Sequence, residues 1–197
     1  KEADKYLHFI EEMEKKLCSD EYQILVKPHQ QVYHQIEERS DIKGKFVPSS
    51  VDTNELLSVT DILVTDYSSI FFDFLATGRP VLFYIPDLEE YEDTRGFYLP
   101  LEELPGPASK SLKDVPQWIT NIEDVQCEYS TLYEKNVRWV LEHEDGHVCD
   151  RIIDAVWFGK DQSVCQQRVT EKPKLLLYRG GLSENGITRS FMSLLNI

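Results

Sequence analysis

The feature that most constrains this chain is a strand–loop–helix–strand pattern over residues 61–84. Residues 62–64 are three consecutive apolar residues, and a second apolar run occupies residues 81–84. Uninterrupted apolar runs of this length are typical of parallel strands covered on both faces. Between them, residues 70–76 have the composition of a helix, and Gly78 is placed to end it. The pattern therefore predicts parallel strands joined by a helix, the unit of a parallel α/β sheet.

The rest of the chain adds helices and shorter strands to this unit. Apolar spacing and turn residues predict helices over residues 2–18, 32–38, 53–58, 112–122, 125–141 and 148–158. Asp52 or Thr53 is placed to cap the third of these helices. Further strands are expected at residues 22–26, 44–47 and 174–178, the last followed by a glycine turn and a helix over residues 183–195.

The charge of the chain is unevenly distributed. The net charge is −14, yet residues 1–170 contain 33 acidic and 17 basic residues, whereas residues 171–197 contain 2 acidic and 4 basic ones. This change in composition predicts a linker over residues 161–173 and the start of another domain after it. The acidic balance argues against nonspecific binding to nucleic acid or anionic lipid. Four widely spaced cysteines suit reduced thiols better than a zinc site or a disulfide framework.

Polar residues follow the central strand directly. Ligands of parallel sheets bind beyond the carboxyl ends of the strands, which directs attention to loops 27–30, 48–53, 65–69 and 85–107. Thr65 and Asp66 end the first strand of the unit, and Ser68 and Ser69 precede the helix. The two serines either cap this helix or offer hydroxyls to an anion at its first turn. Local sequence leaves both interpretations open.

Four more residues are candidates, and three of them have a structural alternative. Asp73 lies one turn after the serines, where it would either accept hydrogen bonds from a ribose or simply complement the helix dipole. His29 follows the predicted strand over residues 22–26 and either neutralises a phosphate or is an exposed histidine. Arg95 is followed by Gly96, which permits close backbone approach. Arg95 either binds phosphate as a fork donor or pairs with the many acids around it. No spacing suggests metal ligands, and we predict no cofactor.

These motifs, in this order, resemble the CDP-glycerol glycerophosphotransferases, the teichoic-acid polymerases and primases of Gram-positive bacteria. Lys27-Pro28-His29 resembles their basic-residue-then-His motif, and residues 146–151 resemble their closing helix. The resemblance covers residues 1–160 and is most specific over residues 61–107. Its motifs there are Thr65-Asp66-Tyr67-Ser68-Ser69, Asp73-Phe74, Gly78-Arg79-Pro80, Arg95-Gly96-Phe97-Tyr98 and Leu104-Pro105-Gly106-Pro107.

The resemblance implies a Rossmann-like parallel sheet that forms the nucleotide-binding half of a GT-B fold. Carried over to this chain, His29, Ser68 and Ser69 would contact the pyrophosphate of CDP, Arg95 would lie on the phosphate side and Asp73 at the ribose. The family commonly has a proline after the histidine, whereas Gln30 follows here. The general base is expected on the other half of the fold, so no catalytic residue is assigned to this chain.

The resemblance also implies a reaction and its partners. A hydroxyl of an acceptor polymer attacks the β-phosphate of CDP-glycerol or CDP-ribitol and releases CMP. This enzyme would work in the cytoplasm at the inner face of the membrane, held there by parts outside this chain, while the isolated chain would be inactive. Residues 174–197 weakly resemble the start of a second GT-B glycosyltransferase. The alternatives are a UDP-sugar glycosyltransferase or epimerase of the same fold, and a non-catalytic nucleotide-binding module.

Overall fold

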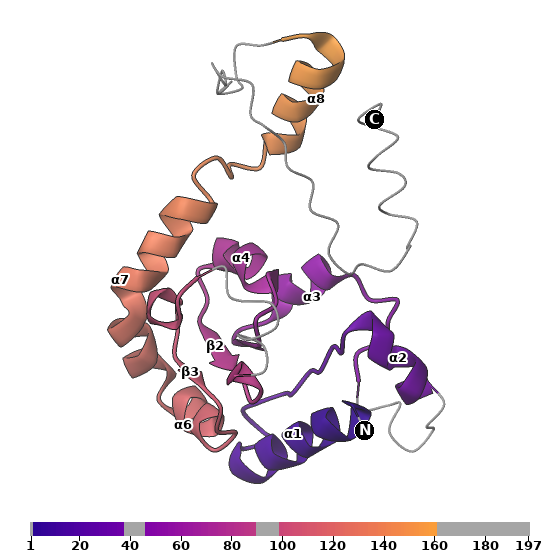
Figure 1. The fold of residues 1–197 in the computed structure, drawn as a ribbon, viewed down its shortest axis with the longest axis vertical. Coiled ribbons are helices and arrows are strands. Elements are labelled where there is room, and N and C mark those ends of the chain that lie inside the picture. Colours follow the sequence, from indigo (N-terminus) through magenta and orange to yellow (C-terminus); the bar gives the residue numbers. More distant parts are fainter. Residues whose placement is uncertain (1, 38–45, 90–98, 161–197) are drawn as a thin grey trace. The chain divides into compact units, whose positions relative to one another are not determined.

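The computed structural model describes residues 2–37, 46–89 and 99–160 (Figure 1). The chain divides into two units, residues 1–144 and residues 145–197. The helices of the first unit are α1 (Glu2–Lys16), α2 (Gln30–Glu37), α3 (Thr53–Val59), α4 (Ile70–Phe74), α6 (Asp114–Thr120) and α7 (Ile122–Val140), with short 3-10 helices η2 (Leu75–Thr77) and η3 (Leu101–Glu103). The second unit contributes α8 (Val148–Phe158). These positions confirm every helix predicted within the described ranges, and Asp52 caps α3 through its carboxylate.

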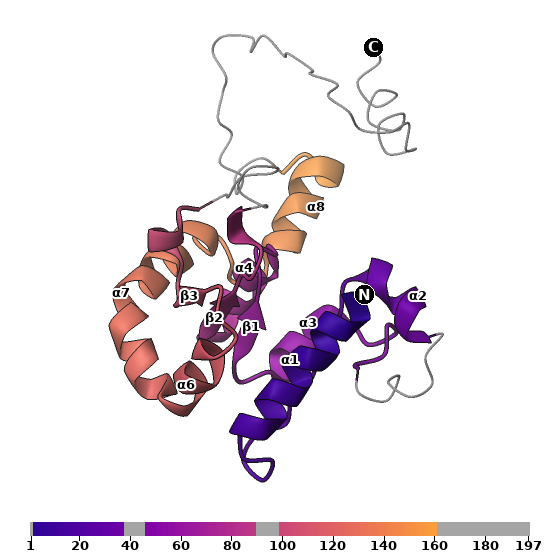
Figure 2. The ribbon, with the colours of Figure 1, turned by 60° about the horizontal axis from the view of Figure 1, so that its bottom comes forward.

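The first unit is built on a three-stranded parallel sheet. Its strands β1 (Leu63–Thr65), β2 (Val81–Tyr84) and β3 (Ala108–Ser109) lie side by side in that order (Figure 2). In register, Leu63 pairs with Val81, and Phe83 pairs with Ala108. The predicted α/β class and the parallel β–α–β unit are therefore confirmed.

The central strand β2 is buried on both faces. Val81 and Phe83 face a cluster that also contains residues of α4, η2 and α7, whereas Leu82 faces a second cluster with residues of α1 and α6. Leu63 of β1 packs with the first cluster, and its neighbours Ile62 and Val64 pack with the second. Both predicted strands are uninterrupted apolar runs because successive side chains point into different cores.

Two expected strands are absent from the described residues. Residues 22–26 are not a strand, and neither are Phe46 and Val47, while residues 44–45 lie outside the described ranges. The backbone of Val47 donates one hydrogen bond to Val26 O, at 2.9 Å. Val26 and Phe46 are buried in a third apolar cluster with residues of α1 and α2. The apolar run therefore packs against two helices, and a short apolar run does not by itself distinguish such a segment from a buried strand. The elements expected within residues 161–197 also lie outside the described residues.

Two of the motifs have structural roles at the amino end of β2. Gly78 ends the helix that follows β1 with a φ of 71°, as predicted. Next to it, the Arg79 guanidinium donates to Ser58 O at 2.9 Å and Thr60 O at 2.7 Å, which ties the end of α3 to the start of β2. Gly106 lies so close to β2 that a Cβ atom there would be 1.8 Å from Val81 O. Only glycine permits this approach.

Helix α7 is fastened to this same end of the sheet. Tyr133 donates its hydroxyl hydrogen bond to Arg79 O, at 2.9 Å, and burial raises the pKa of Tyr133 to about 12. Asn136, which is 2% exposed, donates from Nδ2 to Glu103 O at 2.8 Å. These bonds hold the chain before β3 and the chain before β2 against one helix.

Substitution of Gly78 and of Gly106 should destabilise the protein to different extents. Gly106→Ala should lower the free energy of unfolding by about 3 kcal/mol, since the added methyl overlaps the backbone of β2. Gly78→Ala, the matched control, meets open space and should cost only about 1 kcal/mol for its left-handed conformation. Urea denaturation measures both values. Equal losses would contradict the close approach of Gly106 to Val81.

Candidate functional site

Three loops meet at the carboxyl edge of the sheet. Because β1, β2 and β3 are parallel neighbours, the segments that follow them, residues 66–69, 85–89 and 110–113, leave the sheet at one edge. This is the edge where ligands of such sheets bind. Figure 2 shows the three strands from which these loops depart.

The loop after β1 is shaped by its own carboxylate. Thr65 is the last residue of β1, and Asp66 accepts a hydrogen bond from the Ser68 backbone N–H at 2.9 Å. Ser69 occupies the capping position of α4, but its hydroxyl makes no capping hydrogen bond. The capping interpretation of Ser69 is therefore not supported. Both serine side chains are exposed.

Side-chain bonds join each loop to the next. Tyr67 donates its hydroxyl to Asp87 Oδ1 at 2.5 Å, which links the loops after β1 and β2. Lys110 Nζ donates to Glu89 Oε1 at 2.5 Å, which links the loops after β2 and β3. The Lys110 ammonium also holds the pKa of Glu89 below its ordinary value.

The sequence alone predicts no role for these four linking residues. Tyr67 lies inside the motif at residues 65–69, whereas Asp87, Glu89 and Lys110 belong to none of the motifs. The signal that could have found them is position, since each follows a strand by a few residues. The contacts themselves join residues 20 or 21 positions apart, and they exist only once the strands have paired.

His29 has a different setting from the one expected. Because residues 22–26 are not a strand, His29 does not follow a strand end; it is exposed and directly precedes α2. Its carbonyl accepts a hydrogen bond from Val32 N–H at 2.8 Å. The neighbouring Lys27 ammonium donates to Val51 O at 2.6 Å and so joins this segment to the chain before α3.

The remaining predicted residues divide into two groups. Asp73 is exposed on α4, four positions after Ser69. Arg95 and Gly96 lie outside the described residues.

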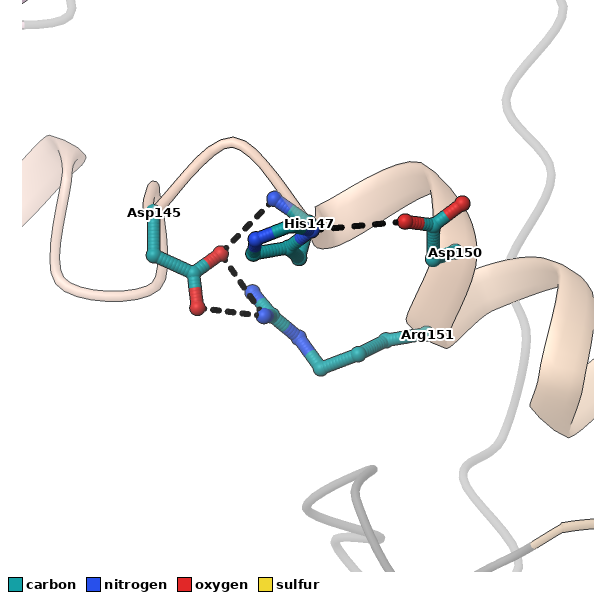
Figure 3. Close-up of polar contacts among 4 residues, drawn as sticks. All are labelled: Asp145, His147, Asp150 and Arg151. Atoms are coloured by element: carbon teal, nitrogen blue, oxygen red, sulfur yellow. Dashed lines mark hydrogen bonds and ion pairs between the residues drawn. The ribbon is translucent and has the colours of Figure 1, made fainter.

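The second unit carries a polar cluster at the start of α8 (Figure 3). The Arg151 Nη1 donates to both carboxylate oxygens of Asp145, each at 2.7 Å, and the His147 backbone N–H donates to Asp145 at 2.9 Å. His147 Nδ1 lies 3.4 Å from Asp150. The Arg151 guanidinium and then the His147 N–H hold the pKa of Asp145 below its ordinary value. The motif at residues 146–151 therefore fixes how the chain enters α8.

This cluster predicts a measurable titration. Because the pKa of Asp145 is lowered in the folded state, the stability it contributes is present at neutral pH and is lost as the pH falls through that pKa. Arg151→Gln should raise the Asp145 pKa towards its ordinary value, as followed by carboxyl carbon NMR. Arg138→Gln, which removes an exposed pair with Glu134 on α7, should leave it unchanged. An Asp145 pKa that is unchanged by Arg151→Gln would contradict this arrangement.

Two features of residues 2–37, 46–89 and 99–160 bear on the kind of site. Within those residues, no three histidine, cysteine, aspartate or glutamate side chains are grouped so that they could hold a metal ion. No described helix is long and apolar enough to cross a bilayer. Cys18, Cys127 and Cys149 are free, exposed thiols.

The parallel sheet with polar loops at its carboxyl edge defines a Rossmann-like α/β domain. The chain belongs to the CDP-glycerol:poly(glycerophosphate) glycerophosphotransferase family, whose sequence profile matches residues 6–158. This confirms the resemblance that the motifs indicated.

Relatives agree with this assignment. The teichoic acid glycerol-phosphate transferase of Staphylococcus aureus is 35% identical over 144 residues, which are 70% of this chain and 36% of that protein. The teichoic acid ribitol-phosphate primase of Bacillus spizizenii is 38% identical over 103 residues, 52% of this chain and 26% of that protein. The chain thus spans about a third or less of the length of these relatives.

The fold is also found in a solved structure of the family. The wall teichoic acid polymerase TagF superposes with a TM-score of 0.63 at 28% identity, over 73% of this chain and 36% of that one. A variant of TagF soaked with CDPG superposes equally well. The predicted GT-B-like, Rossmann-type architecture is thereby confirmed.

Proposed function

We propose that this chain is the donor-binding part of a CDP-glycerol or CDP-ribitol glycerophosphotransferase of teichoic acid synthesis. The observation that carries the proposal is the family match over residues 6–158, combined with three linked polar loops at the carboxyl edge of the sheet. Residues 1–160 would form the nucleotide-binding half of the GT-B fold, residues 161–173 a linker, and residues 174–197 the start of a second glycosyltransferase domain.

In the proposed donor site, neutral hydroxyl donors supply part of the contacts to the phosphates. The exposed hydroxyls of Ser68 and Ser69 would donate to the diphosphate, in a loop whose turn Asp66 holds after Thr65. Hydroxyls suit a chain whose first 170 residues are strongly acidic, because they bind an anion without requiring a basic surface.

The other predicted residues would complete the contacts to the donor. His29 and Arg95 would add positive charge beside the phosphates, with Gly96 allowing the backbone to approach. Asp73, exposed on α4, would accept hydrogen bonds from the ribose. Lys110 is a further cation at the carboxyl edge, available by exchange of its exposed partner Glu89.

The reaction forms one phosphorus–oxygen bond and breaks another. An acceptor hydroxyl attacks the β-phosphate, the bond from that phosphorus to the bridging oxygen breaks, and CMP leaves with its electron pair. Such transfers depend mainly on positioning and charge stabilisation. The base that takes the hydroxyl proton would lie outside this chain, so we expect the isolated chain to bind donor without turning it over. In the whole protein, the acceptor is a polyol-phosphate polymer at the cytoplasmic membrane face.

Binding of donor by the full chain tests the proposal. In calorimetry, CDP-glycerol should bind more tightly than UDP, and Ser68→Ala should weaken CDP-glycerol about tenfold, as expected for loss of one hydrogen bond to a charged group. Cytidine affinity should not change, since cytidine has no phosphate. Ser130→Ala, which removes an exposed hydroxyl from α7, is the matched control and should leave both affinities intact.

Three results would count against the proposal. Equal or tighter binding of UDP would favour a UDP-sugar transferase or epimerase. An equal loss of cytidine and CDP-glycerol affinity in Ser68→Ala would remove the phosphate role of that serine. A folded chain that binds no donor would refute the donor site altogether.

A further inference from the structure

The loops after β1 and β2 are joined by a bond between side chains that are far apart in sequence. Tyr67 and Asp87 are 20 positions apart, and the tyrosine hydroxyl donates to the carboxylate at 2.5 Å. The register brings them together, because Thr65 pairs with Phe83 and the two strands then end side by side. A hydroxyl that donates to a carboxylate forms a charge-assisted hydrogen bond, which is stronger than a neutral one.

Two hydrogen bonds constrain the proposed phosphate loop, and Tyr67 makes one of them. Asp66 holds the Ser68 backbone N–H from within the loop, at 2.9 Å, and Tyr67 fastens the loop to its neighbour. The Ser68 and Ser69 side chains are exposed. Packing therefore does not fix where their hydroxyls point, and the backbone that bears them has to be held by bonds of this kind.

We infer that Tyr67 and Asp87 form a positioning pair for the diphosphate of the donor, an inference that rests on the proposed function. Neither side chain contacts the ligand in this role. They act through Ser68 and Ser69, by ordering the loop before the donor arrives. Binding then loses less conformational entropy than it would if the donor had to order the loop itself.

A simpler view of Asp87 makes the opposite prediction. A carboxylate near a diphosphate repels it, and if Asp87 acted only through its charge, Asp87→Asn would strengthen donor binding. If Asp87 acts by holding Tyr67, the same substitution weakens donor binding, because the asparagine amide is a poorer acceptor. The sign of the change in affinity therefore separates the two views.

A double-mutant cycle on the full chain tests the pair. The affinities of CDP-glycerol and cytidine are measured by calorimetry for the wild type, Tyr67→Phe, Asp87→Asn and the double variant. Each single substitution should weaken CDP-glycerol about three- to tenfold, as expected for one hydrogen bond. The double variant should lose no more than either single one, because both remove the same bond. Cytidine affinity should stay constant in all four proteins.

Tyr133→Phe is the matched control. It also removes a hydrogen bond donated by a tyrosine hydroxyl, but here the acceptor is the main-chain oxygen of Arg79 at the amino end of the sheet. It should lower the melting temperature and leave the ratio of CDP-glycerol to cytidine affinity unchanged, so a general loss of stability is distinguished from a loss of positioning.

The outcomes separate the two claims. If the wild type binds CDP-glycerol and the variants bind it as tightly or more tightly, the positioning pair is wrong and the proposed function stands. Losses that multiply in the double variant, or that affect cytidine equally, also overturn the pair. If the wild type binds no donor, the proposed function fails and the pair fails with it.

Discussion

The structure depends on the burial of β2 between two parallel neighbours. Val81 and Phe83 enter one core and Leu82 enters the other, so this strand joins the helices on both faces of the sheet. Its pairing with β1 and β3 then decides which loops become neighbours. The candidate site at the carboxyl edge depends on this pairing, because the loops that would line it come from three separate stretches of the chain.

The two ends of the sheet differ in the kind of contact they make. At the amino end, Gly106 touches the backbone of β2, Arg79 ties down α3, and Tyr133 fastens α7. These contacts are with main-chain oxygens and serve the fold. At the carboxyl end, the bonds are between side chains on loops, and hydroxyls remain exposed. The family motifs therefore fall into a structural set and a set available to a ligand, a division that motif order alone does not reveal.

Much of this was predictable because the strongest signals are local. The β–α–β unit follows from two apolar runs, the cap of α3 from Asp52, and the end of the helix after β1 from Gly78. The prediction of a strand at residues 22–26 was wrong, because an apolar run indicates burial and does not by itself indicate strand pairing. The links from Tyr67 and Lys110 could not be predicted, since their partners become neighbours only through the order of the strands. The roles of Ser68 and His29 stay predictions.

The proposed function requires the donor to bind at the carboxyl edge of this sheet. The most direct test is an amide NMR titration of the full chain with CDP-glycerol. The largest shifts should occur at residues 65–69 and 85–89, with small shifts at residues 78–81 and 104–107 at the opposite end. Shifts concentrated at the amino end, with the loops after β1 and β2 unmoved, would contradict it.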